Sequence, residues 1–274
     1  MGRHTSIVRD NYALEVESVT AYYGSRRILD DVSLKVGYGE IMVIMGGSGS
    51  GKSTLLRHML SLNTLTAGGI RLLGLDIAHA SADELHKLRQ NIGVSFQSGA
   101  LLSSLTVGEN VALPLREHTD LDDNIIQISA KLKLEVVNLG GFDHLYPAQL
   151  SGGMIKRAAL ARALAMDPKL LFFDEPSAGL DPVVSSELDD LILKLRDSLK
   201  MTMVVVTHEL ESAFKIADRI TVLDHGRILI SGTVDEVRSS TIARVQDLLQ
   251  RRSRPTELSA EDYLQRLTGH ANKA

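Results

Sequence analysis

A glycine-rich run that contains one lysine is the segment of this sequence best suited to bind phosphate. Residues 46–54 read GGSGSGKST and fit the pattern G-x-x-x-x-G-K-[ST]. Glycines let the backbone turn tightly, so that successive N–H groups converge on phosphate oxygens. A lysine in this position reaches the β- and γ-phosphates, and the following serine hydroxyl ligates Mg²⁺. The sequence therefore predicts a nucleoside triphosphate site built from Gly46, Gly47, Ser48, Gly49, Ser50, Gly51, Lys52, Ser53 and Thr54.

The segments on either side of this loop support the same interpretation. The apolar run 41–45 is typical of a fully buried strand, and residues 55–60 have a helical pattern. A helix that begins at the loop directs the positive end of its dipole at the phosphates. A dinucleotide-binding fingerprint fits less well, because Lys52 stands where its third glycine would lie, counted from Gly47.

Three further side chains that could act on a bound triphosphate follow apolar runs. Asp174 and Glu175 come directly after the run 170–173, and His208 follows the run 203–206. Asp174 is a candidate Mg²⁺ ligand, and Glu175 is a candidate general base for the attacking water. Taken alone, an acidic pair more often belongs to a helix N-terminus, and a lone histidine is more often structural. The phosphate loop upstream favours the catalytic interpretation.

The composition restricts the class of protein. Of 274 residues, 44% are hydrophobic and 23% are charged, which is the balance of a folded globular chain. A net charge of −4 does not favour a broad nucleic-acid surface, and the lack of cysteine excludes disulfides, thiolate metal sites and thiol nucleophiles. No apolar stretch reaches the roughly 18 residues of a membrane-spanning helix. We therefore expect a cytoplasmic chain that does not cross a bilayer by itself and has no nucleic-acid partner.

Buried runs that alternate with helical segments predict an α/β fold with a largely parallel sheet. Helical periodicity dominates between about residues 98 and 166, which indicates a helical insertion. Thr233 and Glu236 form the pattern of a capping box, and a short helix is expected after Ser259. The predicted strands are the fully apolar runs 41–45, 170–173, 203–206 and 220–223 and the alternating segments 14–20, 27–29 and 32–36.

Residues 150–154, LSGGM, resemble the signature of ATP-binding-cassette (ABC) transporter ATPases, and the resemblance extends over residues 14–235 with the motifs in the family's order. It implies an α/β P-loop NTPase (RecA-like) core with a mainly parallel sheet, an antiparallel β-subdomain from residues 14–40 and a helical α-subdomain at about 98–166. Residues 236–274 would form a C-terminal helical extension. The resemblance also implies roles for Tyr23 (adenine stacking), Gln97 (Q-loop and metal), Asp174 and Glu175 (Walker B and catalytic glutamate), Asp181 (D-loop, 177–181) and His208 (switch histidine).

The signature also implies a composite site. Ser151, Gly152 and Gly153 precede a helical stretch, so their hydroxyl and N–H groups would form an anion site at a helix N-terminus. In the family this site faces the ATP of a second copy in a head-to-tail dimer. Met154 departs from the usual glutamine, and methionine cannot supply amide hydrogen bonds. Ser151, Gly152 and Gly153, which would face the phosphate, match the family's signature.

Further runs are similar to the ATPase of maintenance-of-lipid-asymmetry (Mla) phospholipid transporters, namely QSGAL at 97–101, PLREHT at 114–119 and the methionine of the signature. This resemblance implies phospholipid transport between inner and outer membranes, at the cytoplasmic face of a bacterial inner membrane. The implied partners are an integral membrane permease, a STAS-domain accessory protein and an MCE-domain protein. Two alternatives stay open: an ABC importer subunit for another solute, and a non-transport ABC ATPase.

Overall fold

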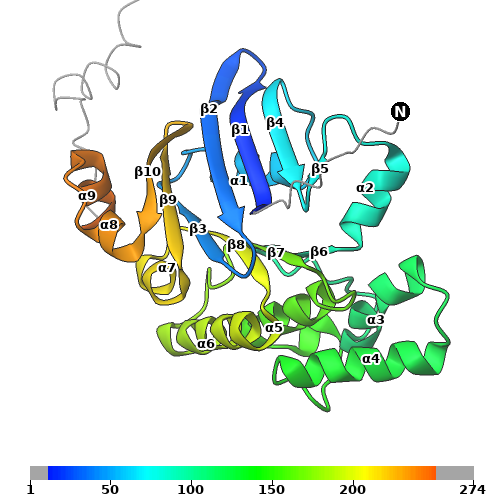
Figure 1. The fold of residues 1–274 in the computed structure, drawn as a ribbon. Helices are drawn as coiled ribbons and strands as arrows, with labels where there is room; N and C mark the ends of the chain where they lie inside the picture. Colours follow the sequence, from blue (N-terminus) through cyan, green and yellow to red (C-terminus); the bar gives the residue numbers. More distant parts are fainter. Residues whose placement is uncertain (1–11, 251–274) are drawn as a thin grey trace, which may run out of the picture.

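The computed structural model describes residues 12–250. Within them, two sheets and a group of helices lie in layers, with the antiparallel strands β1, β2 and β4 at one end and the helices α3–α6 at the other (Figure 1). In the same range, no helix is both long and apolar enough to cross a membrane. The helix predicted after Ser259 lies outside the described residues.

The larger sheet carries the site. Its strands, in spatial order, are β10 (Arg227–Thr233), β9 (Arg219–Asp224), β3 (Ile41–Met45), β8 (Thr202–Thr207), β7 (Leu170–Asp174) and β6 (Ile92–Ser95). All neighbours are parallel except the edge pair β10 and β9. The four apolar runs of the sequence correspond to β3, β7, β8 and β9, so the predicted parallel sheet is confirmed. The carboxyl ends of β3, β7 and β8 lie together at one edge, which brings their loops into one region.

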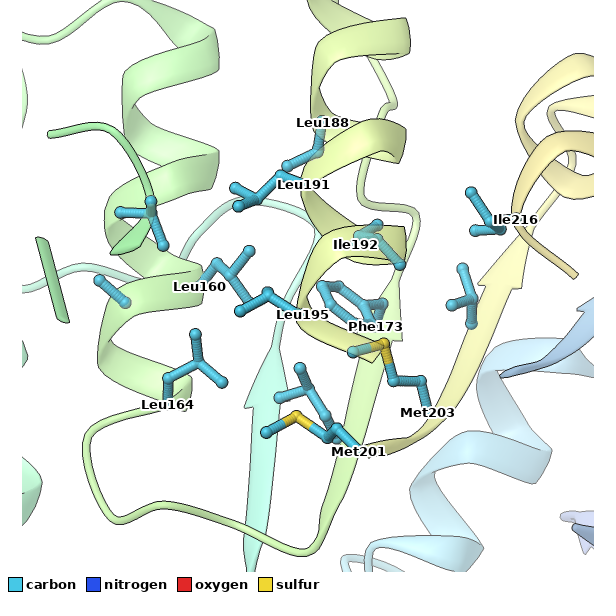
Figure 2. Packing of buried hydrophobic residues seen from close by; sticks show 14 of the residues in the cluster. Leu160, Leu164, Phe173, Leu188, Leu191, Ile192, Leu195, Met201, Met203 and Ile216 are labelled. Carbon is cyan, nitrogen blue, oxygen red and sulfur yellow. The ribbon is translucent and has the colours of Figure 1, made fainter. Parts of the chain in front are cut away.

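This sheet is covered on both faces, which explains its continuous apolar runs. Val43 of β3 and Phe173 of β7 face the helices, whereas Ile44 and Phe172 face the antiparallel sheet and α1. Figure 2 shows Phe173 among residues of α6 and β8. Because both faces are packed, the loops at the strand ends have a rigid base.

The smaller sheet has the order β2–β1–β4–β5 and is antiparallel. Its strands are β1 (Tyr12–Tyr23), β2 (Arg26–Gly37), β4 (Ala67–Leu72) and β5 (Leu75–Asp76). The prediction of two separate strands at 27–29 and 32–36 was wrong, because β2 is continuous through this region. Asp31 has a φ of 54°, so the strand accommodates an irregular residue there without a turn.

The helices predicted between residues 98 and 166 are present as α3 (Val107–His118), α4 (Asp123–Val136), the 3₁₀ turn η1 (Pro147–Gln149) and α5 (Gly152–Ala163). The others are α1 (Lys52–Met59), α2 (Ala82–Arg89), α6 (Pro182–Leu199), α7 (Leu210–Ile216), α8 (Val234–Arg238) and α9 (Ala243–Leu249). The capping box expected at Thr233 and Glu236 begins α8 and is confirmed, since each side chain bonds the other residue's backbone N–H.

Candidate active site

The glycine-rich loop connects β3 to α1, and two of its glycines are needed for steric reasons. A Cβ on Gly46 would lie 2.1 Å from the carbonyl oxygen of Leu223 on β9. Gly51 is the N-cap of α1 with a φ of 107°, a conformation that other residues rarely adopt. No side chain caps α1, so its first N–H groups are available to an anion. A hollow of about 260 Å³ lies over this loop, lined by residues 49–54 with Arg26 and Ile28.

Lys52 is held inside the loop. Its Nζ donates hydrogen bonds to the carbonyl oxygens of Gly46 (2.8 Å) and Gly47 (3.1 Å). Burial lowers the pKa of Lys52, and the nearby carboxylates of Glu175 and Asp174 partly oppose this shift. The ammonium group therefore contacts the loop backbone and is within electrostatic reach of two acidic side chains, and it can also attract phosphate.

Asp174 is the last residue of β7 and is partly buried. Burial is the main cause that raises the pKa of its carboxyl group, and the adjacent Glu175 raises it further. The opposing effects of Arg57, Lys156 and Lys52 are smaller. Within residues 12–250, Asp174 Oδ1 and the phosphate-loop atom Ser50 Oγ are buried and accept or donate no hydrogen bond. Buried polar atoms are normally paired, so these two oxygens are suited to a ligand.

Glu175 and His208 lie together at adjacent strand ends. His208 Nδ1 is 2.9 Å from Glu175 Oε1, and Glu175 Oε2 accepts hydrogen bonds from Thr207 Oγ1 (3.2 Å) and from the backbone N–H of His208 (3.3 Å). The Glu175 side chain is only 12% exposed, whereas that of His208 is 56% exposed. Three contacts thus hold the carboxylate of Glu175 in place. Of the two side chains, that of His208 is the one exposed to solvent.

A lysine that the sequence analysis did not single out lies behind this cluster. Lys156, on α5, is 8% exposed, and its Nζ donates hydrogen bonds to the carbonyl oxygens of Gln97 and Glu175. The side chain of Gln97 is exposed. Lys156 could have been found from its place in the helix, where it precedes the buried run 158–161.

The remaining predicted residues occupy three separate places. Tyr23, at the end of β1, is 82% exposed and pairs with Arg26, which lines the hollow over the phosphate loop. Asp181 caps α6 by accepting hydrogen bonds from the N–H groups of Val183 and Val184. Ser151 caps α5 in the same way. Across the described part of the chain, no hydrogen bond or ion pair joins Ser151 to the phosphate loop.

Comparison with known proteins decides the family. The sequence profile of the family described as ABC transporter matches residues 29–178, which is more than half of the chain. The chain belongs to the ABC transporter family. It is therefore an ABC ATPase subunit, which binds and hydrolyses ATP, and the resemblance seen in the sequence is confirmed.

Three known proteins are similar to this ABC ATPase over most of its length. The intermembrane phospholipid transport system ATP-binding protein MlaF of Haemophilus influenzae is 40% identical, over 93% of this chain and 97% of that protein. The probable ribonucleotide transport ATP-binding protein mkl of Mycobacterium leprae is 39% identical, over 91% and 72%. Among solved structures, the dimeric post-hydrolysis state of the ATP-binding cassette MJ0796 bound to ADP and Pi has a TM-score of 0.74 at 33% identity, over 81% and 98%. The predicted cassette fold is confirmed.

Proposed function

We propose that this ABC ATPase powers the movement of phospholipid between the inner and outer membranes of a bacterium. The observation that carries this proposal is the 40% identity to the H. influenzae phospholipid transport protein, which spans nearly all of both chains. The similar identity to the M. leprae protein, over a smaller share of that relative, supports transport of another solute as the second candidate.

The proposed hydrolytic roles follow from the geometry of the site. Lys52 and the N–H groups at the start of α1 bind the β- and γ-phosphates, while Glu175 takes a proton from the attacking water. His208 orients the carboxylate of Glu175 through the 2.9 Å contact. Tyr23 stacks on the adenine, close to the hollow that Arg26 lines.

The residues present also fit a bound Mg²⁺. Mg²⁺ prefers oxygen ligands and is usually held by one or two carboxylates together with substrate phosphates. Asp174 Oδ1 is buried without a hydrogen-bond partner within the described residues, and Ser53 supplies a hydroxyl at the start of α1. We assign Ser53, Gln97 and Asp174 to this ion, which when bound neutralises charge on the phosphates.

The exposed position of the signature supports a dimer. Ser151, Gly152 and Gly153 begin α5 on the surface, where they can bind the ATP held by a second copy, and Asp181 lies in the adjoining D-loop. The solved MJ0796 cassette is dimeric. We assign residues 14–235 to the ATP-binding domain and residues 236–274 to a C-terminal extension.

The proposed assembly places this subunit at the cytoplasmic face of the inner membrane. An integral membrane permease would carry the lipid, with a STAS-domain protein and an MCE-domain protein as accessory partners.

The test is to isolate the chain from its host with the membrane proteins that accompany it and to reconstitute that complex in liposomes. ATP-dependent transfer of a fluorescent phospholipid, absent with Glu175→Gln, is the expected result. ATP-dependent uptake of a ribonucleotide or another solute without lipid transfer would contradict the proposal.

A further inference from the structure

Lys156 is a buried cation that joins two parts of the site by their main chains. Its Nζ donates one hydrogen bond to the carbonyl oxygen of Gln97, in the loop after β6, and another to that of Glu175 (3.2 Å), directly after β7. Burial lowers the pKa of Lys156, and Glu175 and Asp174 counteract this effect. A buried ammonium group is costly unless hydrogen bonds and opposite charges surround it, and both are present here.

The main chain of Glu175 needs such support. Its φ is 49°, in the left-handed region, which is unfavourable for a residue with a side chain. A residue stays in this conformation only where its surroundings fix it. The Glu175 N–H donates to the carbonyl oxygen of Val206 (2.8 Å), while the Glu175 carbonyl oxygen accepts from Lys156 and from the N–H of Ala178. Lys156 is the one side chain among these main-chain partners.

A second cation on α5 provides a comparison. Arg162 donates hydrogen bonds to the carbonyl oxygens of Ala100 (2.7 Å) and Gly99 (2.9 Å), in the same loop that Gln97 begins. Both cations therefore attach α5 to residues 97–100. Of the two, Lys156 also contacts Glu175.

We propose that Lys156 is a positioning residue for ATP hydrolysis, which holds the main chains of Glu175 and Gln97 in one fixed arrangement. A shift of the Gln97 segment then moves the lysine and, through it, the carboxylate of Glu175. Lys156 donates to neither Gly46 nor Gly47 of the phosphate loop, whose backbone Lys52 contacts instead, so the main effect is expected on turnover and a smaller one on nucleotide binding. The inference rests on the proposed role of Glu175 as the general base.

The experiment compares four variants of the full-length chain, isolated with its membrane partners. Lys156→Met keeps the length of the side chain but removes its donor and charge, and Lys156→Arg keeps both. Arg162→Met is the matched control, because it loosens the loop at 99–100 and leaves the contact with Glu175 intact. Glu175→Gln reports on the base itself. The assays are kcat and KM for ATP, the Kd of a fluorescent ATP analogue and the melting temperature.

A hydrogen bond to a charged group contributes enough to change turnover about tenfold or more. We expect Lys156→Met to lower kcat by at least about tenfold, with KM and Kd changed less than about twofold, and Lys156→Arg to recover most of the activity. Arg162→Met should keep kcat within about threefold. If Lys156→Met melts early, Lys156→Gln, which removes the charge but keeps an NH₂ donor group, takes its place.

If Lys156→Met hydrolyses ATP at the wild-type rate while Glu175→Gln is inactive, the inference about Lys156 is wrong, but the proposed role of Glu175 as the base stands. An equal loss in Arg162→Met would also overturn it, because the effect would then be a general loosening of α5. An active Glu175→Gln would instead show that the proposed base is wrong.

Discussion

Replacement of Gly46 by alanine tests whether the fold sets the shape of the phosphate loop. The added Cβ would lie 2.1 Å from the carbonyl oxygen of Leu223 and 2.8 Å from Ser50 Oγ, whereas ordinary contacts begin at 3.4 Å. The loop and β9 must therefore separate by more than about 1 Å, which is the scale of displacement that costs about 10²-fold in catalysis. Overpacking of this kind also lowers the free energy of unfolding by about 1–3 kcal/mol.

The loop displacement should also reach Lys52, since its Nζ donates to the carbonyl oxygen of Gly46. We expect Gly46→Ala to weaken binding of a fluorescent ATP analogue, to lower kcat/KM by about 10²-fold and to melt several degrees below the wild type. Gly47→Ala is the matched control, because its Cβ would meet its nearest neighbours, Leu248 and Arg244, at 3.8 and 3.9 Å. Wild-type binding, turnover and melting of Gly46→Ala would refute the steric reasoning.

Three more predictions concern Lys52, Ser151 and Asp189, which is a buried residue of α6 outside the site. Lys52→Ala should raise the Kd for the ATP analogue about tenfold or more, because a charge-assisted phosphate contact is lost. An unchanged Kd would show that the phosphate loop is not the nucleotide site. Ser151→Arg should abolish hydrolysis but leave nucleotide binding by the single copy intact, and mixing it with Lys52→Ala should restore part of the activity, since one site of the mixed dimer carries neither change. Loss of binding by Ser151→Arg itself would contradict the shared site. Burial raises the pKa of Asp189, whose carboxylate accepts a hydrogen bond from Ser212 Oγ. The free energy of unfolding therefore includes the full contribution of the Asp189 carboxyl group below the ordinary aspartate pKa. This contribution is lost as the pH rises through the raised pKa. Asp189→Asn should stabilise the protein against urea at pH 8 and have a smaller effect at a pH below the ordinary aspartate pKa, and an equal change at both would contradict this.

The central strands could be predicted because packing on both faces leaves an uninterrupted apolar run. The edge strands β6 and β10 of the larger sheet and the strand β4 of the smaller sheet gave no such signal. β6 contains Gly93, where a Cβ would lie 2.4 Å from the carbonyl oxygen of Ala163, so a close helix and not strand propensity determines that residue. β10 is half-exposed and includes Gly232, and β4 begins with Ala67 and two glycines. β6 and β4 form by pairing with β7 and β1, which are distant in sequence, and local pattern does not record such pairing.

The site divides in the same way. The phosphate loop, Asp174 and Glu175 follow from short motifs whose chemistry depends on residue type and spacing. The contact of His208 with Glu175 needs two strands to lie side by side, which the sequence indicated only through the order of its apolar runs. The role of Lys156 depends on carbonyl oxygens of two separate loops. Every residue has a carbonyl oxygen, so residue types could not predict these contacts.

Substitution of Glu175 by glutamine tests most directly whether this cluster hydrolyses ATP. Glutamine keeps the volume of the side chain and an oxygen that can accept from Thr207 and His208, but it cannot take a proton from water. In the full-length protein isolated with its membrane partners, we predict an ATPase rate at least about 10²-fold below the wild type. The Kd for ATP should be unchanged, and the dimer should persist in the presence of ATP. Turnover near the wild-type rate would contradict the account, because the proton acceptor would then lie elsewhere.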